Sequence, residues 1–590
     1  MKSFLERRLS LPQAGAMGGL LAAIAFLYAL ASRAFPFCFR SDEAVYVLLA
    51  RYLMAGHFFA FGADPLPGYS LLLIIPDRLL DSHWHWYWTV GVSLTLATAT
   101  LSWLLARRLL PPPAAFAVFI LTACHPLFVE FSGTLMPDIP FTGLSLLVFL
   151  LANQSRNISN VSALCLAGAL TALTRPEGSL VVLCAGAIVF FNGGWKKAFL
   201  FCLSALSPVS LWLARDYWLN KTLTGYAANW SSQASSVGGL LAQSQIAARW
   251  LAGVLGWNFW GLPTSWPRWL LLVAGGGTLL AAGRGAISLL DGRRDPASRV
   301  LSFGISCYIV LLLCLHITWK AVAGRYLLHF LPFLWILILA GLDGGIKPRS
   351  TGFLVVALLL FNFMRSDVRL ARLGISKPRA ITLPKTVAWI KSRTPPNAKF
   401  QSIEWPVLLL LTGRSSYPPI LIPLRDLWLG AMLSQGISYA QVAHLSPDGF
   451  LTPAMAGIIR NEMRWARSSR YIRRVFFNPD ENSEIFRVSH PDPSRYLKAL
   501  DLYQKAVEEL LAGKNIARVR QKLIDSAELE PTLSIPWQML ASIEKNPGER
   551  LDYLKKAAVA EPESRRIRAV LEAARAAQHA RHAGTGRNSS

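Results

Sequence analysis

The sequence predicts a polytopic α-helical membrane protein that ends in a soluble region. Of the 590 residues, 53% are hydrophobic and only 16% are charged, whereas soluble domains carry about 25% charged residues. The apolar residues are concentrated before residue 365, and several runs reach the roughly 18 residues that cross a bilayer. From residue 366 onward the composition resembles that of an ordinary soluble protein. We therefore expect a membrane domain over 1–365 and soluble domains after it.

The apolar runs indicate about eleven spans. The first run is too long for a signal peptide and lacks a small-residue cleavage site, so we interpret it as a retained span. Three of the runs, 139–153, 161–174 and 179–193, are short for a hydrocarbon core of about 30 Å. The expected spans are 14–33, 86–106, 113–130, 139–153, 161–174, 179–193, 197–214, 267–290, 299–317, 327–344 and 350–364.

The basic loops indicate a direction. Lys and Arg are enriched in cytoplasmic loops, and with a cytoplasmic N-terminus the basic loops of this chain fall on one side. This arrangement needs a break between 161–174 and 179–193, where Pro176 disfavours a continuous helix. The C-terminal region then lies outside the cytoplasm, in the periplasm of a Gram-negative cell. The residues concerned are Lys2, Arg7, Arg8, Arg107, Arg108, Arg156, Lys196, Lys197, Arg293, Arg294, Lys347 and Arg349.

The first outward loop, 34–85, predicts two short helices at the membrane surface. SDEAVYVLLARYLMAG is typical of a helix with Ser41 as its N-cap and Gly56 as its stop. LPGYSLLLIIPDRLL follows, and a group of Trp residues comes after it. Segments that are apolar but too short to span, with Trp at their end, favour an interfacial position.

The soluble region predicts two domains and a tail. Residues 366–490 mix short apolar runs with Pro and Gly, as a small α/β domain does. Residues 491–580 have a helical pattern, and AELEP at 527–531 and AVAEP at 558–562 resemble the ends of tetratricopeptide-type units. Residues 581–590 are expected to be a disordered tail.

The net charge of +26 does not indicate nucleic acid as a partner. Much of the basic charge lies in short loops, where it sets topology, and no dense basic cluster contains interleaved aromatic residues. An anionic membrane lipid surface is the partner that this pattern favours. The seven Cys show no CxxC or metal-ligand spacing, so they predict neither a disulfide framework nor a metal site.

Asp42 and Glu43 are candidate catalytic acids just after the first span. Adjacent acids at a membrane surface can take a proton from a hydroxyl or hold a divalent cation. Acids in the first turn also stabilise the positive end of a helix, which is their commonest role. No cofactor is certain, and a divalent cation at this pair stays open.

Asp138, in LMPDIP, is a third candidate acid. It lies at the edge of an apolar stretch, where desolvation of a carboxylate is costly. A helix-capping role is equally compatible with its position. In the motif TRPEG, Arg175 and Glu177 are interpreted first as a structural ion pair at a Pro-Gly turn, with a supporting role at the site as the alternative.

Lys320, Arg325 and Tyr326 lie between the spans 299–317 and 327–344. A fixed Arg near the bilayer, with a Lys nearby, suits the phosphate of a lipid headgroup. Lys and Arg at span ends also snorkel to the interface without any ligand. Arg325 is the better candidate because it opens the apolar run RYLLHFLPFL.

The ordered set of motifs resembles the membrane-embedded GT-C glycosyltransferases, and more narrowly the bacterial relatives of protein O-mannosyltransferases and of the lipid A aminoarabinose transferase. The set is SDEAVY, the two interfacial helices, ARRLL, LMPDIP, ALTRPEGSL and GRYLLHFLPFL, followed by WIKSRTPPNAKF and LLTGRSSYP. It covers about 14–420. No Walker loop, GxSxG, HExxH or DxD motif is found, so the sequence provides no nucleotide-sugar site.

The resemblance implies transfer of a sugar from a polyprenyl-phosphate donor to an acceptor glycan, lipid or protein at the outer face. By the same resemblance Asp42 serves the acceptor, with Glu43 beside it, and Asp138 is the second acid. Arg325 and Lys320 then hold the carrier phosphate. The carrier-binding Lys of the aminoarabinose transferases has no clear counterpart in the first loop.

Two other classes of function remain open at this stage. A transporter or flippase of lipid-linked sugar would use the same Arg, but it is expected to show internal repeats and charges deep in its spans. A membrane scaffold would use the helical C-terminal region to bind a protein partner.

Overall fold

The computed structural model separates into two compact units, Met1–Ile381 and Thr382–Ser590, here called the membrane unit and the C-terminal unit. Each is described by itself. The structure describes Ile24, Tyr28, 41–57, 65–80, 86–154, 158–220, 268–318, 324–343, 356–365, 367–368, 383–420, 422, 424–443, 463–467 and 469–585.

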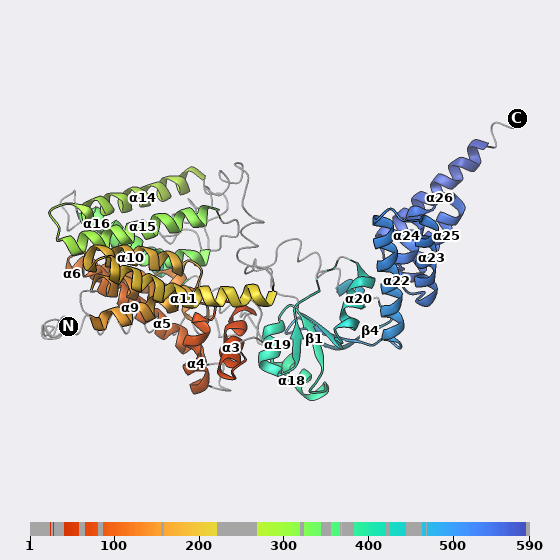
Figure 1. Cartoon of the computed structure of the whole chain (residues 1–590), viewed down its shortest axis with the longest axis horizontal. Coiled ribbons are helices and arrows are strands. Elements are labelled where there is room, and N and C mark those ends of the chain that lie inside the picture. The colour runs from red at the N-terminus through yellow and green to blue at the C-terminus, as the bar shows by residue number, and fades with distance from the viewer. Residues whose placement is uncertain are drawn as a thin grey trace. The chain divides into compact units, whose positions relative to one another are not determined.

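The membrane unit is built from helices (Figure 1). The described ones are α3 (Ser41–Met54), α4 (Gly68–Leu80), α5 (Trp88–Ala106), α6 (Pro112–Ala123), α7 (Pro126–Ser132), α8 (Asp138–Asn153), α9 (Ile158–Thr174), α10 (Gly178–Gly193), α11 (Trp195–Asn220), α14 (Arg268–Leu290), α15 (Pro296–Thr318), the 3-10 helix η2 (Gly324–His329), α16 (Leu331–Asp343) and an apolar helix at Val356–Arg365.

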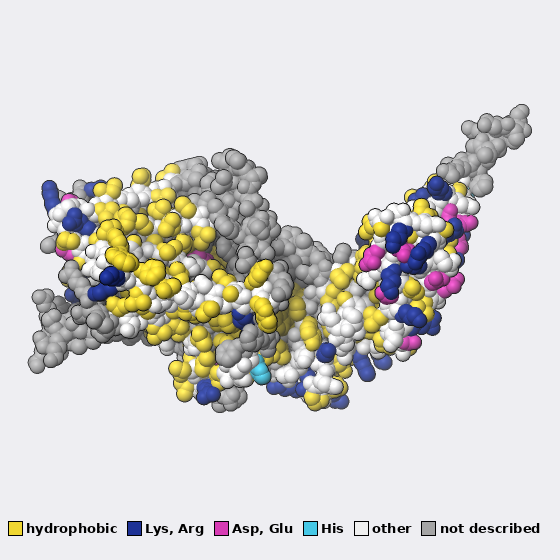
Figure 2. Space-filling view, viewed as in Figure 1, with side chains coloured by type: hydrophobic (Ala, Val, Ile, Leu, Met, Phe, Trp, Pro, Cys, Tyr) yellow, Lys and Arg dark blue, Asp and Glu magenta, His cyan; other side chains and the backbone are white. Residues whose placement is uncertain are grey.

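Several of these helices are suited to a bilayer. Among the described residues, Trp88–Ala106, Trp195–Trp218 and Pro296–Leu315 are long and apolar enough to span, and α6 with α7 forms a fourth candidate bent by 52°. Hydrophobic side chains cover the visible face of this unit over α9, α10 and α11 (Figure 2). Large apolar side chains such as Phe199 and Leu280, which are 62% and 77% exposed, require an apolar solvent. The chain is a membrane protein, and the number of eleven spans stays a prediction.

Close backbone packing joins helices in the interior of this unit. A Cβ atom added at Gly285 of α14 would lie 1.7 Å from the carbonyl oxygen of Leu337 in α16. At Gly341 the corresponding distance, to the carbonyl oxygen of Ala281, is 2.2 Å. Small residues therefore let α14 and α16 meet backbone to backbone, as is common between membrane helices.

The two short helices predicted between the first two spans are present and cross-linked. Arg51 of α3 donates two hydrogen bonds to Asp77 of α4, at 3.0 and 2.9 Å, and the Tyr87 hydroxyl donates to the same carboxylate. Gly56 adopts a φ of +75° after α3, as its predicted stop position requires.

One side of α4 leaves apolar residues uncovered. Leu71, Ile75 and Leu79 are 39%, 69% and 79% exposed, and their spacing of four residues places them along one stripe of the helix. Such a stripe suits a helix that lies in the membrane interface.

The C-terminal unit contains a five-stranded sheet in the order β2-β1-β3-β5-β4. β1 pairs in parallel with β2 and β3, and β5 pairs antiparallel with β3 and β4. The elements are α18 (Pro384–Arg393), β1 (Lys399–Ser402), α19 (Trp405–Thr412), β2 (Ser415–Tyr417), α20 (Arg425–Ser434), β3 (Tyr439–Ala443), β4 (Ile472–Asn478) and β5 (Ser483–Val488).

Five helices complete this unit, and each contacts the next in sequence. They are α22 (Pro493–Leu511), α23 (Ile516–Leu529), α24 (Ile535–Ile543), α25 (Pro547–Ala560) and α26 (Arg565–Thr585). The sheet and the helices share a core, because Tyr496 and Leu500 of α22 pack with Trp428 of α20 and Phe486 of β5.

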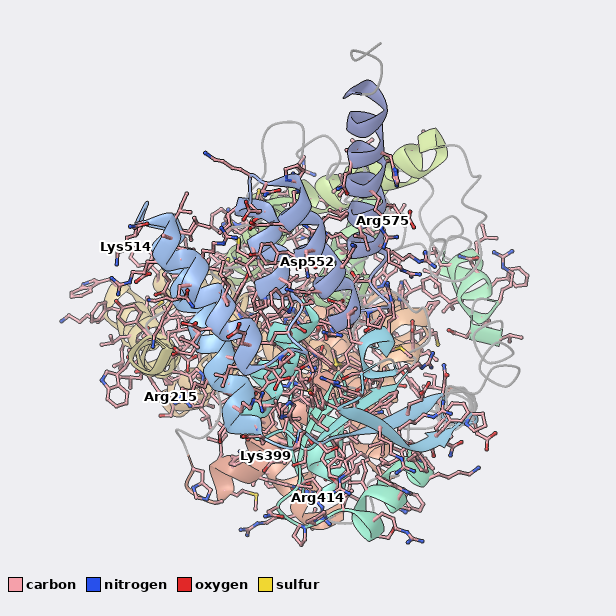
Figure 3. All side chains as sticks on the ribbon, turned by 90° about the vertical axis from the view of Figure 1, so that its right-hand side faces the viewer. Arg215, Lys399, Arg414, Lys514, Asp552 and Arg575 are labelled. Carbon is pink, nitrogen blue, oxygen red and sulfur yellow. The ribbon has the colours of Figure 1, made fainter. Side chains whose placement is uncertain are left out.

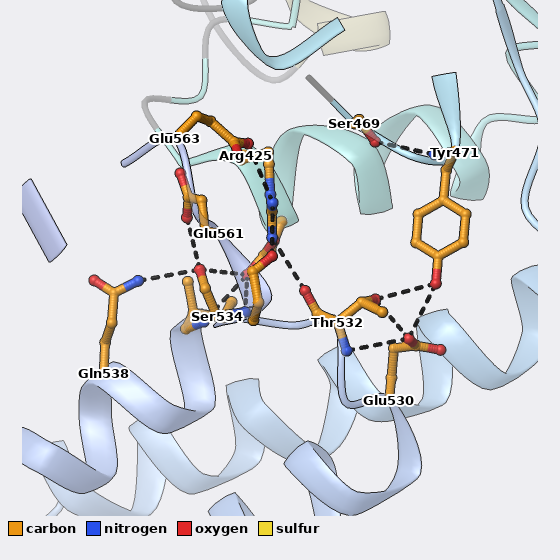
Figure 4. Close-up of polar contacts among 12 residues, drawn as sticks. Arg425, Ser469, Tyr471, Glu530, Thr532, Ser534, Gln538, Glu561 and Glu563 are labelled. Atoms are coloured by element: carbon orange, nitrogen blue, oxygen red, sulfur yellow. Dashed lines mark hydrogen bonds and ion pairs between the residues drawn. The ribbon is translucent and has the colours of Figure 1, made fainter. Parts of the chain in front are cut away.

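A polar joint holds the helical array to α20 (Figure 4). Asp426 accepts hydrogen bonds from the backbone N–H and hydroxyl of Ser534, at 2.6 and 2.9 Å, at the start of α24. Arg425 donates to the carbonyls of Thr532 and Ala560, both at 3.0 Å. Cutting the chain at residue 490 would therefore separate groups that satisfy one another.

Candidate active site

Acidic and basic side chains from four segments of the membrane unit meet at the ends of its helices. Asp138 opens α8, the turn between α9 and α10 carries Arg175 and Glu177, η2 carries Arg325, and Asp42 lies in the first turn of α3. The chain breaks between α9 and α10, where Pro176 was predicted to break it. The groups that sequence reasoning placed on one face therefore come together in space.

The centre of this cluster is the ion pair between Asp138 and Arg175. Arg175 Nη1 donates a 2.8 Å hydrogen bond to Asp138 Oδ1, and the two side chains are 9% and 0% exposed. Arg175 also donates to Glu177 through Nε and Nη2, both at 3.3 Å. The predicted Arg175–Glu177 pair is thus present, but Arg175 bridges two acids instead of one.

Asp138 is only partly satisfied by this pair. Its Oδ1 also lies 3.4 Å from Nε2 of His329, which is fully buried. Its Oδ2 is buried and accepts no hydrogen bond from any described residue. Buried polar atoms are normally hydrogen-bonded. Asp138 Oδ2 is therefore an acceptor for which the described residues supply no donor.

Tyr326 lies between the two arginines of the site. The guanidinium carbon of Arg175 is 4.9 Å from the centre of the Tyr326 ring, and that of Arg325 is 5.5 Å from it. Such cation–π contacts orient the cations without neutralising them. Tyr326 therefore helps to orient both guanidinium groups, of which Arg175 is already paired with two acids.

Asp42 and Arg325 form the more accessible part of the site. Arg325 Nη1 lies 3.7 Å from Asp42 Oδ2, with side chains 18% and 59% exposed. Nε and Nη1 of Arg325 make no hydrogen bond within the described part of the chain. Asp42 is thus open to an incoming group, and Arg325 retains hydrogen-bond donors for it.

Glu43 faces inward, unlike its neighbour Asp42, and is only 1% exposed. Tyr69 at the start of α4 is fully buried, and its hydroxyl has no hydrogen-bond partner among the residues that the structure describes. Burial raises the pKa of Tyr69 well above its ordinary value, and the charges of Glu43 and Asp138 raise it further. The Tyr69 hydroxyl is therefore a protonated donor near both acids.

A glycine fixes the place of Tyr69. A Cβ atom at Gly68 would lie 2.6 Å from the backbone of Leu173 and Thr174 at the end of α9. The start of α4 therefore packs backbone to backbone beside the Arg175 turn. Tyr69 and His329 were not recognised from the sequence, although His329 lies only four residues after Arg325 in GRYLLH.

Two sequence expectations are not tested by this geometry. Lys320 lies outside the described residues. Within the described part of the chain, no three His, Cys, Asp or Glu side chains cluster in a way that could hold a metal ion. Asp42 and Glu43 also face different surroundings, since one is exposed and the other buried.

The arrangement provides an exposed carboxylate, two oriented guanidinium groups and a buried acid that holds one of them. An exposed carboxylate can accept a proton, and guanidinium groups can stabilise a phosphate. The carboxylate that can accept a proton and a guanidinium that can bind a phosphate lie next to each other, because Arg325 contacts Asp42.

Comparison with known proteins adds a likeness in fold. No family model and no curated protein matches the chain. Two solved structures of ArnT from Cupriavidus metallidurans do match, one in the apo state and one bound to undecaprenyl phosphate. Each is 10% identical in sequence, and each match covers 81% of this chain and 99% of that chain, with TM-scores of 0.54 and 0.55. The chain therefore has an ArnT-like fold, which confirms the resemblance to the lipid A aminoarabinose transferase at the level of fold.

Proposed function

We propose that this protein is a GT-C-type glycosyltransferase that moves a sugar from a polyprenyl-phosphate donor to an acceptor at the extracytoplasmic face of the bacterial inner membrane. The observation that carries the proposal is the meeting of Asp42, Arg325, Arg175 and Asp138 in an ArnT-like fold. The undecaprenyl phosphate bound in one ArnT structure supports a polyprenyl-phosphate carrier here as well. The acceptor is a glycan, a lipid or a protein.

In the proposed reaction Asp42 is the general base. It removes the proton from the acceptor hydroxyl as the acceptor oxygen bonds to the anomeric carbon of the sugar. The bond from that carbon to the phosphate oxygen breaks on the opposite side, so the configuration inverts. The exposure of Asp42 supports this role, because an acceptor must reach the base.

Arg325 is proposed to stabilise the leaving phosphate, with Lys320 as a second cation. Negative charge grows on the phosphate oxygen as the bond breaks, so a preorganised guanidinium lowers the barrier. The Nε and Nη1 donors of Arg325 support this assignment. Arg325 lies close to Asp42. This proximity suits a reaction in which the acceptor hydroxyl loses its proton while the leaving phosphate gains negative charge.

Asp138 is proposed to act at the site through Arg175. A fully buried carboxylate in a 2.8 Å ion pair is poorly placed to meet an acceptor directly. It can instead fix the Arg175 guanidinium, which Tyr326 and Glu177 also orient. Glu43, which follows Asp42 and is buried, is retained as a candidate catalytic acid.

A deletion strain tests the proposal. Mass spectrometry of its surface glycans, lipids and proteins should show the loss of one sugar, and the wild-type gene should restore that sugar. Asp42→Asn should not restore it although the protein is inserted in the membrane. The matched variant is Asp291→Asn, which changes an exposed acid in the loop between α14 and α15. Full restoration by Asp42→Asn would remove Asp42 as the base, and an unchanged set of surface sugars in the deletion strain would overturn the function.

A further inference from the structure

Basic side chains form a row along one edge of the sheet in the C-terminal unit. The register places Lys399 of β1 opposite Ser415, the first residue of β2. Arg414 directly precedes Ser415 and therefore lies at the same end of the sheet as Lys399. On the other side of β3, Arg487 of β5 is opposite Arg473 of β4. The amino ends of the three parallel strands and the paired ends of β4 and β5 therefore carry four cations. With strands about 4.8 Å apart, the row is roughly 19 Å long.

The last turn of α18 extends this row. It carries Lys391 and Arg393. Arg414 Nη2 donates to the carbonyls of Lys391 and Thr394, at 3.3 and 3.1 Å, which brings the end of α18 to the same edge. Figure 3 shows Lys399 and Arg414 near each other, and Lys514 and Arg575 of the helical array away from them. The edge is here called the basic edge: Lys391, Arg393, Lys399, Arg414, Arg473 and Arg487.

The positive charge of the basic edge is not neutralised within the described residues. None of its six side chains lies within 4.0 Å of a described carboxylate, although ion pairs occur elsewhere in the unit. Arg473 and Arg487 are both exposed and directly opposed, and like charges in that position destabilise a sheet. The opposite edge differs, since Asp480 and Glu481 follow β4 and pair with the start of α18. The sheet is thus electrically polarised, and an anionic partner would relieve the repulsion at one edge.

The short linker that joins the two units favours one kind of anionic partner. Only 14 residues, 369–382, separate Val368, the last described residue of the membrane unit, from Leu383, the first described residue of the C-terminal unit. That length spans at most about 50 Å. The C-terminal unit is therefore tethered to a chain segment that lies in the membrane, and lipid phosphates are within its reach. Lipid headgroups are present there at high local concentration, whereas a soluble polyanion would have to diffuse in.

We propose that the basic edge docks the C-terminal unit on anionic lipid headgroups of the adjacent leaflet. Each Lys or Arg near an anionic surface shifts the docked-to-free ratio by about fivefold. The proposal requires a membrane protein but not sugar transfer, so it can fail or succeed independently of the proposed function.

Hydrogen–deuterium exchange of the full chain in nanodiscs tests this docking. Backbone amides of 389–399, 412–416 and 472–474 should exchange more slowly in discs containing phosphatidylglycerol than in discs of phosphatidylcholine alone. Salt at 0.5 M should remove the difference, because the screening length falls to about 4 Å. Equal exchange in the two lipids would overturn the proposal.

Two variants that remove the same number of charges make the test specific. Lys391, Arg393, Arg473 and Arg487 changed together to Gln should abolish the lipid-dependent slowing. Lys514, Arg550, Lys555 and Arg575, which are exposed on the helical array, changed together to Gln should preserve it. If both variants lose the effect, or if protection requires a soluble polyanion and not the lipid, the basic edge is not a lipid-docking surface.

Discussion

The two units each contain a buried Arg–Asp pair at 2.8 Å, and the pairs differ in how completely they are satisfied. In the C-terminal unit, both oxygens of Asp426 accept hydrogen bonds, from Arg425, Ser534 and Ile535. In the membrane unit, Asp138 Oδ2 accepts none from the described residues, and Arg325 nearby keeps unused donors. A closed polar network rigidifies a fold, whereas an open one leaves room for a ligand. The comparison separates a structural joint from a candidate active site.

The largest expected effect is a loss of stability when the Arg425–Asp426 pair is broken. Asp426→Ala leaves buried Arg425 with only the longer 3.5 Å ion pair to Glu563, and it removes the acceptor of the Ser534 and Ile535 N–H groups at the start of α24. Breaking such a pair costs about 3–5 kcal/mol. Urea denaturation of the full chain, followed by tryptophan fluorescence, should show this loss. Asp552→Ala removes the exposed pair with Lys556 and should cost less than about 1 kcal/mol. Similar losses in both variants would contradict a structural joint at Asp426.

Loss of the Asp138–Arg175 pair should instead reduce activity and leave the fold intact. Asp138→Asn should lower kcat/KM for sugar transfer by roughly 10²–10³, the cost of losing a preorganised electrostatic group. Its folded structure should persist, because Arg175 keeps Glu177 as a partner. Transfer kinetics and thermal unfolding measured on the same preparation separate the two effects. Unfolding of this variant to the extent seen with Asp426→Ala would make Asp138 a structural residue as well.

Arg325→Gln tests whether Arg325 binds the phosphate group of the carrier lipid. It should weaken binding of a polyprenyl phosphate by about 1.5–3 kcal/mol, the value of a hydrogen bond to a charged group. Native mass spectrometry with added carrier lipid measures this change. Arg293→Gln, in the exposed loop between α14 and α15, should bind as the wild type does. Equal weakening in both variants would mean that charge in general, and not Arg325, attracts the carrier.

The smallest expected effect is a pH dependence at the joint. Burial raises the pKa of Glu561, which accepts a hydrogen bond from Ser534. A raised carboxyl pKa means that the folded state binds the proton more tightly than the unfolded state. The contribution of this group to stability should therefore decline as pH rises from about 4.5, by at most 1.4 kcal/mol per unit, and level off above the raised pKa. Glu561→Gln should flatten the pH dependence of thermal unfolding, and an unchanged slope would contradict this role.

The sequence predicted which residues share one face of the membrane unit better than it predicted their contacts. Loop charge and the order of the motifs placed Asp42, Asp138, Arg175 and Arg325 at one face, because both are local properties of the chain. The contact between Asp138 and Arg175 joins residues 37 positions apart, and no local pattern specifies such a pairing. The same reason explains why Tyr69 and His329 were missed, since their roles depend on burial next to distant acids.

In the C-terminal unit the strands could be expected, but their order could not. The sheet order depends on crossovers, and the joint brings Asp426 to Ser534 over a separation of 108 residues. The basic edge arises only once β2, β1, β3, β5 and β4 are ordered in one sheet. The segments 527–531 and 558–562 were interpreted as the ends of tetratricopeptide-type units. The helices α23 and α25 end within them, at Leu529 and Ala560, and the assignment to that repeat type stays a prediction. A tetratricopeptide-like role in binding a protein partner stays a prediction.

Release of the carrier tests the central claim most directly. Purified protein in proteoliposomes would be given lipid-linked sugars extracted from the membranes of the deletion strain, together with a membrane fraction from that strain as acceptor. We predict that wild-type protein releases polyprenyl phosphate in step with transfer of the sugar, and that Asp42→Asn does neither. Lipid-linked sugar that crosses the bilayer intact, without release of polyprenyl phosphate, would contradict the account and indicate a flippase.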